Sequence, residues 1–340
     1  MAETVVAVKG LRKLFPIKTG FFSSLLSKRE FFVHAVDGIS FDIKRGEVFG
    51  LVGESGSGKT TTGRLVLRLE DPTEGNITFK GTDITKARES QLKPLRRQMQ
   101  MVFQDPYESL NPRMTITDIL AEPLHVQGLG DKMNVEERVK ELLKDAELTP
   151  PEEFLLRFPH ELSGGQRQRV ATARAFILDP EFIVADEPVS MLDVSVRAGI
   201  IDLMLSLIEK FHASFLYITH DLALARHICD RIGVMYLGKI MESGVTEKVV
   251  YESLHPYTRA LIAAVPVPDP TSRRVEVIVK GEIPSPINPP SGCRFHTRCP
   301  IAMDICKREE PPLVDYGDGH NAACHLVESP NWQKLMRSGS

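Results

Sequence analysis

The chain carries the stretch Gly53-Glu54-Ser55-Gly56-Ser57-Gly58-Lys59-Thr60, and Thr61 follows it. This stretch matches G-x-x-x-x-G-K-[ST], the phosphate-binding P-loop. The mostly apolar residues 47–52 before it predict a buried strand, and residues 61–69 after it predict a helix. A strand, a glycine-rich loop and a helix in this order form the context in which the motif binds phosphate.

The residue types of this motif explain how it would hold a nucleotide. Glycines permit positive φ angles and a close approach of the backbone. Successive N–H groups can then point inward and cradle phosphate oxygens at the start of a helix. We expect Lys59 to neutralise the β- and γ-phosphates and the Thr60 hydroxyl to complete the shell of a Mg²⁺ ion. The residues expected at the nucleotide are Gly53, Glu54, Ser55, Gly56, Ser57, Gly58, Lys59, Thr60 and Thr61.

Length and composition predict a globular chain. Its 340 residues suffice for one large domain and a smaller one. Its net charge of −3 shows no basic surplus that would favour a nucleic-acid partner. No run of 18 apolar residues is present, and the N-terminus lacks the apolar segment of a signal peptide. We therefore expect a cytosolic chain that reaches a membrane only through a partner.

Polar side chains follow three apolar strands predicted downstream of the P-loop. They are Gln104, the pair Asp186 and Glu187, and His220. At the carboxyl end of a central parallel strand, such residues face the ligand crevice. Because adjacent strand residues project in opposite directions, Asp186 suits the Mg²⁺ shell and Glu187 suits a general base for water. Gln104 would ligate Mg²⁺ or hold the attacking water, and His220 would contact the γ-phosphate.

A second anion site is predicted where a later helix begins. Residues 105–159 are interrupted by prolines and contain a helical pattern at 135–146, which indicates a helical insertion. Ser163-Gly164-Gly165-Gln166 follows, with Ser163 as the natural N-cap of the next helix. The positive end of that helix would attract an anion. Two anion sites in one chain call for a common explanation.

Together these pieces resemble the ATP-binding subunit of an ABC transporter. The motifs stand in the order of that family: the P-loop, Gln104, Leu162-Ser163-Gly164-Gly165-Gln166, Asp186-Glu187, Ser190-Met191-Leu192-Asp193 and His220. The resemblance implies an α/β P-loop NTPase with a RecA-like core, an antiparallel β subdomain and a helical signature subdomain. It covers residues 1–255, with the helical subdomain at about 105–170. A small Cys-rich extension at 256–330 and a tail at 331–340 would follow.

The resemblance also implies roles in ATP hydrolysis. Two ATPase domains would form a head-to-tail dimer in which each ATP lies between one P-loop and the opposite signature helix, at Ser163, Gly164, Gly165 and Gln166. Gln104 would sense the γ-phosphate, Glu187 would polarise water, and His220 would hold the γ-phosphate. Phe15, which the sequence leaves open between a core residue and a base-stacking residue, would stack on adenine. The Mg²⁺ ligands would be Thr60, Gln104 and Asp186.

The C-terminal part resembles the extension of oligopeptide and dipeptide importer ATPases. The residues that carry this resemblance are His255-Pro256-Tyr257-Thr258 and the run from Gly292 to Pro300. An apolar insertion at residues 20–33 favours the second of the two paired ATPases of that group. The implied partners are a similar but non-identical ATPase, two transmembrane permease subunits and an extracytoplasmic solute-binding protein. The chain would lie at the cytoplasmic face of the membrane.

Four of the five cysteines lie in this extension, with the spacing C-x5-C-x6-C-x17-C. They are Cys293, Cys299, Cys306 and Cys324. Four thiolates are the number that a 4Fe-4S cluster needs. They also make a closed zinc site, and His296, His320 and His325 lie near in sequence. Bare thiols are the third alternative, and the spacing does not decide among the three. The fifth cysteine, Cys229, is expected to be a buried apolar residue.

Other functions remain open from the sequence. The same ATPase role could serve nickel or oligosaccharide uptake, because the ATPase never touches the solute. A soluble ABC ATPase acting on nucleic acid or ribosomes is disfavoured by the acidic pI of about 6.4. A non-catalytic nucleotide switch is disfavoured by the intact Asp186, Glu187 and His220.

Overall fold

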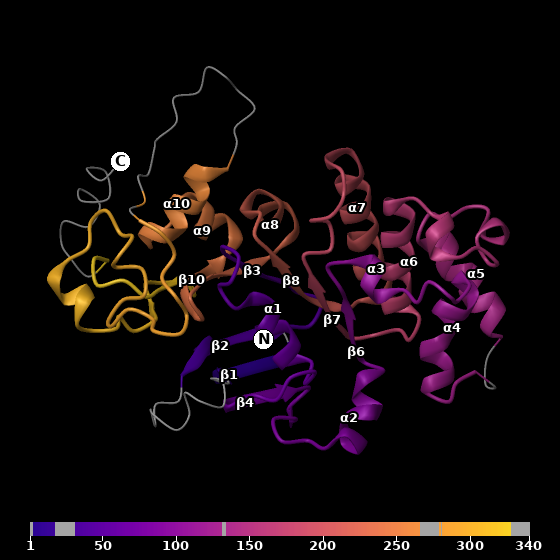
Figure 1. The fold of residues 1–340 in the computed structure, drawn as a ribbon, viewed down its shortest axis with the longest axis horizontal. Coiled ribbons are helices and arrows are strands. Elements are labelled where there is room, and N and C mark those ends of the chain that lie inside the picture. Colours follow the sequence, from indigo (N-terminus) through magenta and orange to yellow (C-terminus); the bar gives the residue numbers. More distant parts are fainter. Residues whose placement is uncertain (1–2, 18–30, 131–133, 266–278, 280, 328–340) are drawn as a thin grey trace, which may run out of the picture. The chain divides into compact units, whose positions relative to one another are not determined.

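A computed structural model describes residues 3–17, 31–130, 134–265, 279 and 281–327 (Figure 1). Most of the insertion predicted at 20–33 and the whole tail at 331–340 lie outside these ranges. The chain divides into two compact units, which we describe separately. The first unit comprises residues 1–6, 42–48 and 79–218, and the second comprises residues 7–41, 49–78 and 219–340. The Cys-rich extension is predicted at 256–330; from here on, the word extension denotes its described residues 281–327.

The first unit contains three parallel strands in the order β8 (Ser214–Thr219), β7 (Phe182–Asp186) and β6 (Met99–Val102). Every residue of β7 and β8 is buried, which confirms the prediction that β7 is a central strand. In register, Met99 lies opposite Phe182, and Phe182 lies opposite Ser214. The carboxyl ends of the three strands therefore lie at one edge of the sheet, and so do the residues that directly follow them.

Helices form the rest of the first unit. α4 (Ile116–Val126), α5 (Val135–Asp145) and α6 (Gly164–Phe176) contact one another and gather together in Figure 1. The buried Val139, Leu142 and Leu143 of α5 recur at helical spacing, as the sequence predicts. The other elements are α2 (Glu89–Arg96), α3 (Pro106–Ser109), α7 (Val194–Phe211), β5 (Thr82–Asp83) and the 3₁₀ turns Pro151–Glu153 and Pro159–Glu161.

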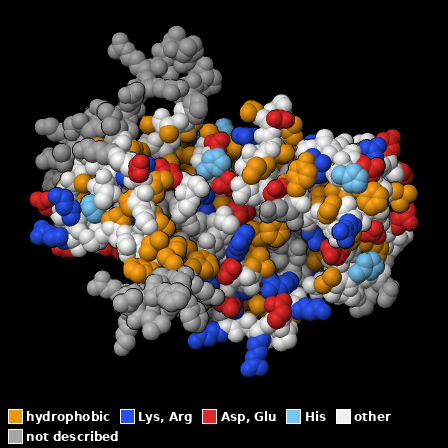
Figure 2. Space-filling view, viewed as in Figure 1, with side chains coloured by type: hydrophobic (Ala, Val, Ile, Leu, Met, Phe, Trp, Pro, Cys, Tyr) orange, Lys and Arg blue, Asp and Glu red, His pale blue; other side chains and the backbone are white. Residues whose placement is uncertain are grey.

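Charged side chains of both signs are interspersed over the face of α4 to α7 shown in Figure 2. Ion pairs join helices and residues of this unit. Arg138 contacts Glu141 at 2.9 Å, and Lys210 contacts Asp145 at 2.6 Å. This mixture agrees with the near balance of 42 basic and 45 acidic residues in the sequence.

The second unit holds the P-loop and the extension. One sheet runs in the order β11 (Val314–Asp315), β12 (Asn321–Ala322), β10 (Lys239–Val245), β9 (Arg231–Tyr236) and β3 (Val48–Val52). A second sheet contains β2 (Phe32–Lys44), β1 (Thr4–Pro16) and β4 (Glu74–Phe79) in that order. The helical elements are α1 (Lys59–Val66), α8 (Leu222–Ile228), α9 (Thr246–Tyr251), α10 (Pro256–Ala264) and the 3₁₀ turn Asp304–Lys307.

β1 continues to Pro16, well beyond its start in the β-branched-rich residues 4–8. Its second half is held by non-local bonds, since the N–H of Leu14 donates to Thr73 Oγ1 at 3.0 Å and the N–H of Thr73 donates to the carbonyl of Arg12 at 2.8 Å. Thr82-Asp83 forms the short strand β5. Cys229 follows α8 as its C-cap and is buried, as the sequence predicts.

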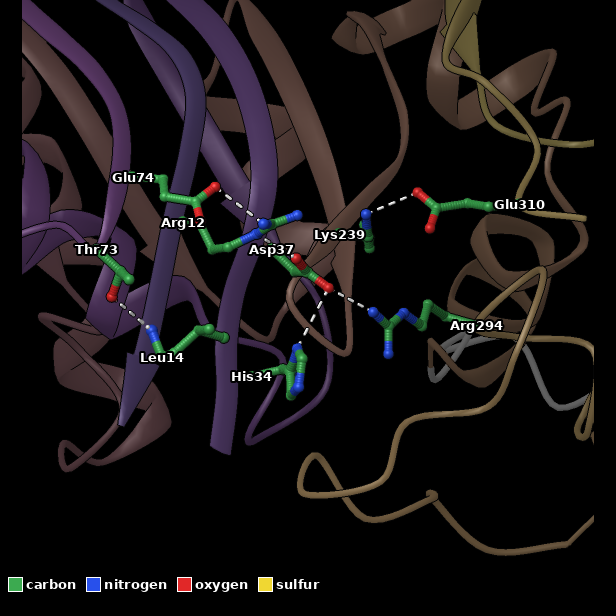
Figure 3. Close-up of polar contacts among 9 residues, drawn as sticks. All are labelled: Arg12, Leu14, His34, Asp37, Thr73, Glu74, Lys239, Arg294 and Glu310. Carbon is green, nitrogen blue, oxygen red and sulfur yellow. Dashed lines mark hydrogen bonds and ion pairs between the residues drawn. The ribbon is translucent and has the colours of Figure 1, made fainter. Parts of the chain in front are cut away.

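The extension is anchored to the rest of its unit by a buried carboxylate on β2 (Figure 3). Asp37 is only 5% exposed and accepts a hydrogen bond from Arg12 Nε at 2.8 Å. Arg294 of the extension donates to the other carboxylate oxygen of Asp37. Burial alone would raise the pKa of Asp37, but the positive charges of Lys239, Arg294, Arg12 and His34 outweigh it and lower the pKa. The carboxylate is therefore ionised and ties two arginines together.

We expect Asp37→Asn to lower the free energy of unfolding by about 3–5 kcal/mol, because it leaves the buried Arg294 without its counter-charge. The folded-state pKa of Asp37 is depressed, so its contribution is fully present above the ordinary carboxyl pKa of about 3.9 and is lost as the pH falls through the folded value. Chemical unfolding of parent and variant at a series of pH values measures this. A gap between the two chains that does not shrink below about pH 3.9 would contradict the assignment.

A second buried carboxylate joins the extension to the sheet. Glu242 on β10 is fully buried and accepts hydrogen bonds from the N–H groups of Leu254 at 2.8 Å and His255 at 2.9 Å. His320 Nε2 lies 2.7 Å from the same carboxylate. Next to it, β12 pairs with β10 in antiparallel register, with Ala322 opposite Glu242. The extension thus supplies the strand that flanks β10.

Candidate nucleotide-binding site

The P-loop connects β3 to α1 within the second unit. Gly58 is the N-cap of α1 and has φ of 103°, a left-handed value. A Cβ atom on Gly58 would lie 2.1 Å from the carbonyl oxygen of Ala35, and one on Gly53 would lie 2.2 Å from that of Met235. Both neighbours are backbone atoms, so a side chain at either position would require the backbone to shift. Both glycines have positive φ angles, as the sequence predicts for this loop.

Lys59 lies at the first position of α1 and is 4% exposed. Its ammonium group donates to the carbonyl of Gly53 at 2.8 Å and to the carbonyl of Glu54 at 3.0 Å. Ser57 Oγ lies 3.4 Å away. The lysine is thus held across the loop by neutral acceptors, and phosphate oxygens are the stronger acceptors for such a charge. Thr60 follows it in the first turn of the helix.

Three polar side chains lie together beyond the strand ends of the first unit. Gln104 and Glu187 are predicted site residues, and Ser190 is their neighbour. Gln104 Nε2 lies 3.4 Å from Glu187 Oε2 and 3.4 Å from Ser190 Oγ. Glu187 has φ of 45°, an unusual value for a residue other than glycine, and its N–H donates to the carbonyl of Ile218 at 2.9 Å. Strain of this kind is characteristic of functional sites. Asp186 ends β7 with only 3% exposure.

Ser190 is the member of this group to which sequence reasoning gave no role. Its hydroxyl donates to the carbonyl of Glu187 at 3.0 Å and so stabilises the turn after β7. The signal in the sequence was its place three residues after Glu187, a spacing at which a serine hydroxyl can form a hydrogen bond with the backbone of a turn.

The signature helix begins as predicted. Ser163 is the N-cap of α6, with its Oγ accepting from the N–H of Gln166 at 3.2 Å. The side chain of Gln166 in turn accepts from the N–H of Ser163 at 2.9 Å, which completes a capping box. A Cβ on Gly165 would lie 2.8 Å from Val196 Cγ1 of α7. The local sequence therefore fixes the start of the helix at Ser163. The next two residues, Gly164 and Gly165, have no side chains.

The two remaining predicted contacts lie in the second unit. His220 follows β8 and is exposed. Phe15 is half-buried on β1, and Lys13 Nζ lies 4.7 Å from its ring centroid. A half-buried ring fits both alternatives that the sequence left open. Their roles at a nucleotide stay predictions.

The four cysteines of the extension lie near enough to one another to interact electrostatically. The N–H of Cys293 donates to the carbonyl of Cys306 at 2.8 Å. Arg294 and Ala323, which neighbour Cys293 and Cys324 in sequence, line one cavity of about 310 Å³. Burial, reinforced by the charges of Cys306 and Cys299, raises the pKa of Cys293 to about 12. Within the described ranges, no three His, Cys, Asp or Glu side chains form a group that could hold a metal ion. The predicted four-cysteine metal site is therefore not a preformed ligand set.

Comparison with known proteins identifies the family of this chain. Residues 36–190 match the family described as ABC transporter. The chain is 49% identical over 327 residues to the oligopeptide transport ATP-binding protein AppF of Bacillus subtilis (strain 168). The aligned residues cover 95% of this chain and 98% of that protein. This chain belongs to the ABC transporter family of ATPases. The C-terminal part of this ABC ATPase, residues 241–306, matches the family described as oligopeptide/dipeptide transporter, C-terminal region.

Solved structures confirm the ABC ATPase fold. The ATP-binding cassette MJ0796, solved as a dimer in a post-hydrolysis state bound to ADP and Pi, matches with a TM-score of 0.60 and 30% identity over 71% of this chain and 98% of that one. The cbiO1 protein from Clostridium perfringens, part of the ABC transporter complex cbiONQ, matches with a TM-score of 0.60 and 25% identity over 74% of this chain and 92% of that one. Among the described helices of this ABC ATPase, none is long and apolar enough to cross a membrane.

Proposed function

We propose that this chain is the ATP-hydrolysing subunit of an ABC importer for oligopeptides or dipeptides. The observation that carries the proposal is the match of both its ATPase region and its C-terminal region to that type of protein. The similarity to AppF over nearly the whole of both chains supports it further. The chain would act at the cytoplasmic face of the membrane as a peripheral subunit.

Its residues would divide the work of hydrolysis, which in phosphoryl transfer is mainly positioning and charge stabilisation. Lys59 and the loop N–H groups would hold the phosphates, and the Mg²⁺ ligands would be Thr60, Gln104 and Asp186. Glu187 would accept a proton from the attacking water. His220 would hold the γ-phosphate and Phe15 would stack on adenine. The contacts of Gln104 with Glu187 and Ser190 support its role as the γ-phosphate sensor.

The assembly would contain a second, non-identical ATPase in head-to-tail contact. Each ATP would then lie between one P-loop and the opposite helix at Ser163, Gly164, Gly165 and Gln166. Two permease subunits would form the membrane path, and an extracytoplasmic binding protein would deliver the solute. ATP would close the ATPase pair, and hydrolysis would reopen it.

The test is peptide uptake by vesicles that contain the assembled importer. We expect ATP-dependent accumulation of a labelled peptide that requires this chain. Accumulation of nickel or an oligosaccharide instead of peptide would keep the ATPase role and replace the solute. ATPase activity that responds to DNA or ribosomes and not to the permease would overturn the transport role.

We propose that the extension binds a 4Fe-4S cluster, with zinc as the rival. The ligand number supports it, because Cys293, Cys299, Cys306 and Cys324 are four thiols of one small region. The backbone hydrogen bond from the N–H of Cys293 to the carbonyl of Cys306, which holds two of these residues side by side, supports it as well. Either metal centre would tie together a segment with few regular elements of its own. Anaerobic purification with an absorption spectrum and metal analysis decides: about four irons per chain indicate the cluster, one zinc indicates a structural site, and neither indicates bare thiols.

A further inference from the structure

An arginine of the extension contacts the P-loop directly. Arg298 Nη1 donates to Glu54 Oε2 at 2.6 Å, and Arg298 Nη2 donates to Glu54 Oε1 at 3.1 Å. These two parallel bonds form a bidentate pair, the strong geometry for guanidinium and carboxylate. Glu54 is the second residue of the P-loop, 244 residues away in sequence. The pair is largely shielded, with 11% of the Arg298 side chain and 28% of the Glu54 side chain exposed.

The guanidinium of Arg298 is held in place by aromatic rings. Its central carbon lies 5.7 Å from the ring centroid of Tyr236 and 5.9 Å from that of Phe295. These rings belong to a cluster with Tyr257, in which all three centroid distances lie between 4.8 and 5.4 Å. Because the arginine is fixed before it meets the carboxylate, little conformational freedom is lost in forming the pair.

Glu54 is also held through its backbone on both sides. Its N–H donates to the hydroxyl of Tyr257 at 3.0 Å, and its carbonyl accepts from Lys59 Nζ at 3.0 Å. The position of Glu54 therefore sets the position of an acceptor for the P-loop lysine. Its carboxylate would otherwise place a negative charge in the loop that has to receive phosphates, and Arg298 neutralises that charge.

From this geometry we propose that Arg298 is a positioning residue for nucleotide binding. It fixes the first turn of the P-loop through Glu54 and cancels the charge of that carboxylate, so that the extension sets the affinity for MgATP. The inference rests on nucleotide binding at the P-loop, which is part of the proposed function.

The chain offers a matched control for this pair. Lys239 Nζ on β10 contacts Glu310 of the extension at 2.6 Å, which is another ion pair between the extension and the rest of its unit. Both residues line the cavity of about 310 Å³, and Figure 3 shows Lys239 pointing toward Glu310. Glu310→Gln therefore removes an ion pair of the extension that does not involve the P-loop.

The experiment measures the dissociation constant of a fluorescent ATP analogue with Mg²⁺ on the full chain. We expect Arg298→Gln to raise it about tenfold, as loss of a charge-assisted bidentate contact does. Glu54→Gln removes the same contact together with the repelling charge, so its loss should be smaller. The double variant Arg298→Gln with Glu54→Gln should regain the share of the affinity that the uncompensated charge of Glu54 costs in Arg298→Gln. Glu310→Gln should bind like the parent chain.

Recovery of nucleotide affinity in the double variant distinguishes this proposal from a role of Arg298 in merely holding the extension in place. If Arg298 only held the extension in place, the double variant would bind no better than Arg298→Gln, and Glu310→Gln would weaken binding as well. Either result overturns the proposal, as does unchanged affinity in Arg298→Gln. A parent chain that fails to bind the analogue would instead refute the proposed ATPase function. Melting temperatures recorded with each variant show whether the extension stays folded.

Discussion

Glu187→Gln is expected to bind MgATP like the parent chain and to hydrolyse it about 10²–10⁴-fold more slowly, the usual range for loss of a general base. The amide keeps the size and shape of the side chain but cannot accept the proton of water. Binding should persist because the phosphate contacts come from the P-loop. Steady-state phosphate release and fluorescent-nucleotide binding on the same preparation measure the two effects.

The first unit offers a control of the same chemistry. Glu181 comes just before β7, the strand that Glu187 follows, and its carboxylate contacts Lys80 at 2.7 Å. Glu181→Gln should leave turnover unchanged. Near-normal turnover in Glu187→Gln would remove Glu187 from the role of base.

Gly58→Ala should reduce the affinity for MgATP by at least about 100-fold. The residue would have to keep a left-handed φ of 103°, which costs about 1–2 kcal/mol for any residue with a Cβ. Its new Cβ would also lie 2.1 Å from the carbonyl oxygen of Ala35, so either the loop or β2 has to shift. Equilibrium binding of a fluorescent ATP analogue measures the loss.

Gly56→Ala separates the two causes. Gly56 has φ of 77°, and nothing lies within 4 Å of its ideal Cβ. The Gly56→Ala variant should therefore introduce only the backbone strain and reduce the affinity for MgATP by only about tenfold. Equal losses in both variants would mean that strain, and not the contact with Ala35, makes Gly58 necessary.

Local sequence signals predicted the parts of the site that lie within one segment. The order of strand, loop and helix around Gly58, the N-cap at Ser163 and the buried strand before Asp186 are all confirmed by the structure. In each case the deciding contacts join residues a few positions apart, so propensity and spacing suffice to predict them.

The contacts of the extension could not be predicted in this way. Arg298 meets Glu54 across 244 positions, and Arg294 meets Asp37 across 257. An arginine next to a cysteine has no local signature for a distant carboxylate, because the pairing depends on how β10, α10 and the extension pack together. The same limit explains β1, whose second half is held by bonds from a segment about 60 residues away.

The pairing of β12 with β10 has a consequence for shortened forms of the chain. Removal of the residues after α10 would strip the partner from β10 and leave an unsatisfied row of N–H and C=O groups there. Such an open strand edge is a template for pairing with other chains and so for aggregation. It would also uncover Glu242, whose partner His320 would be lost. An isolated ATPase region cut near residue 265 should therefore precipitate more readily than the full chain, whatever its affinity for nucleotide.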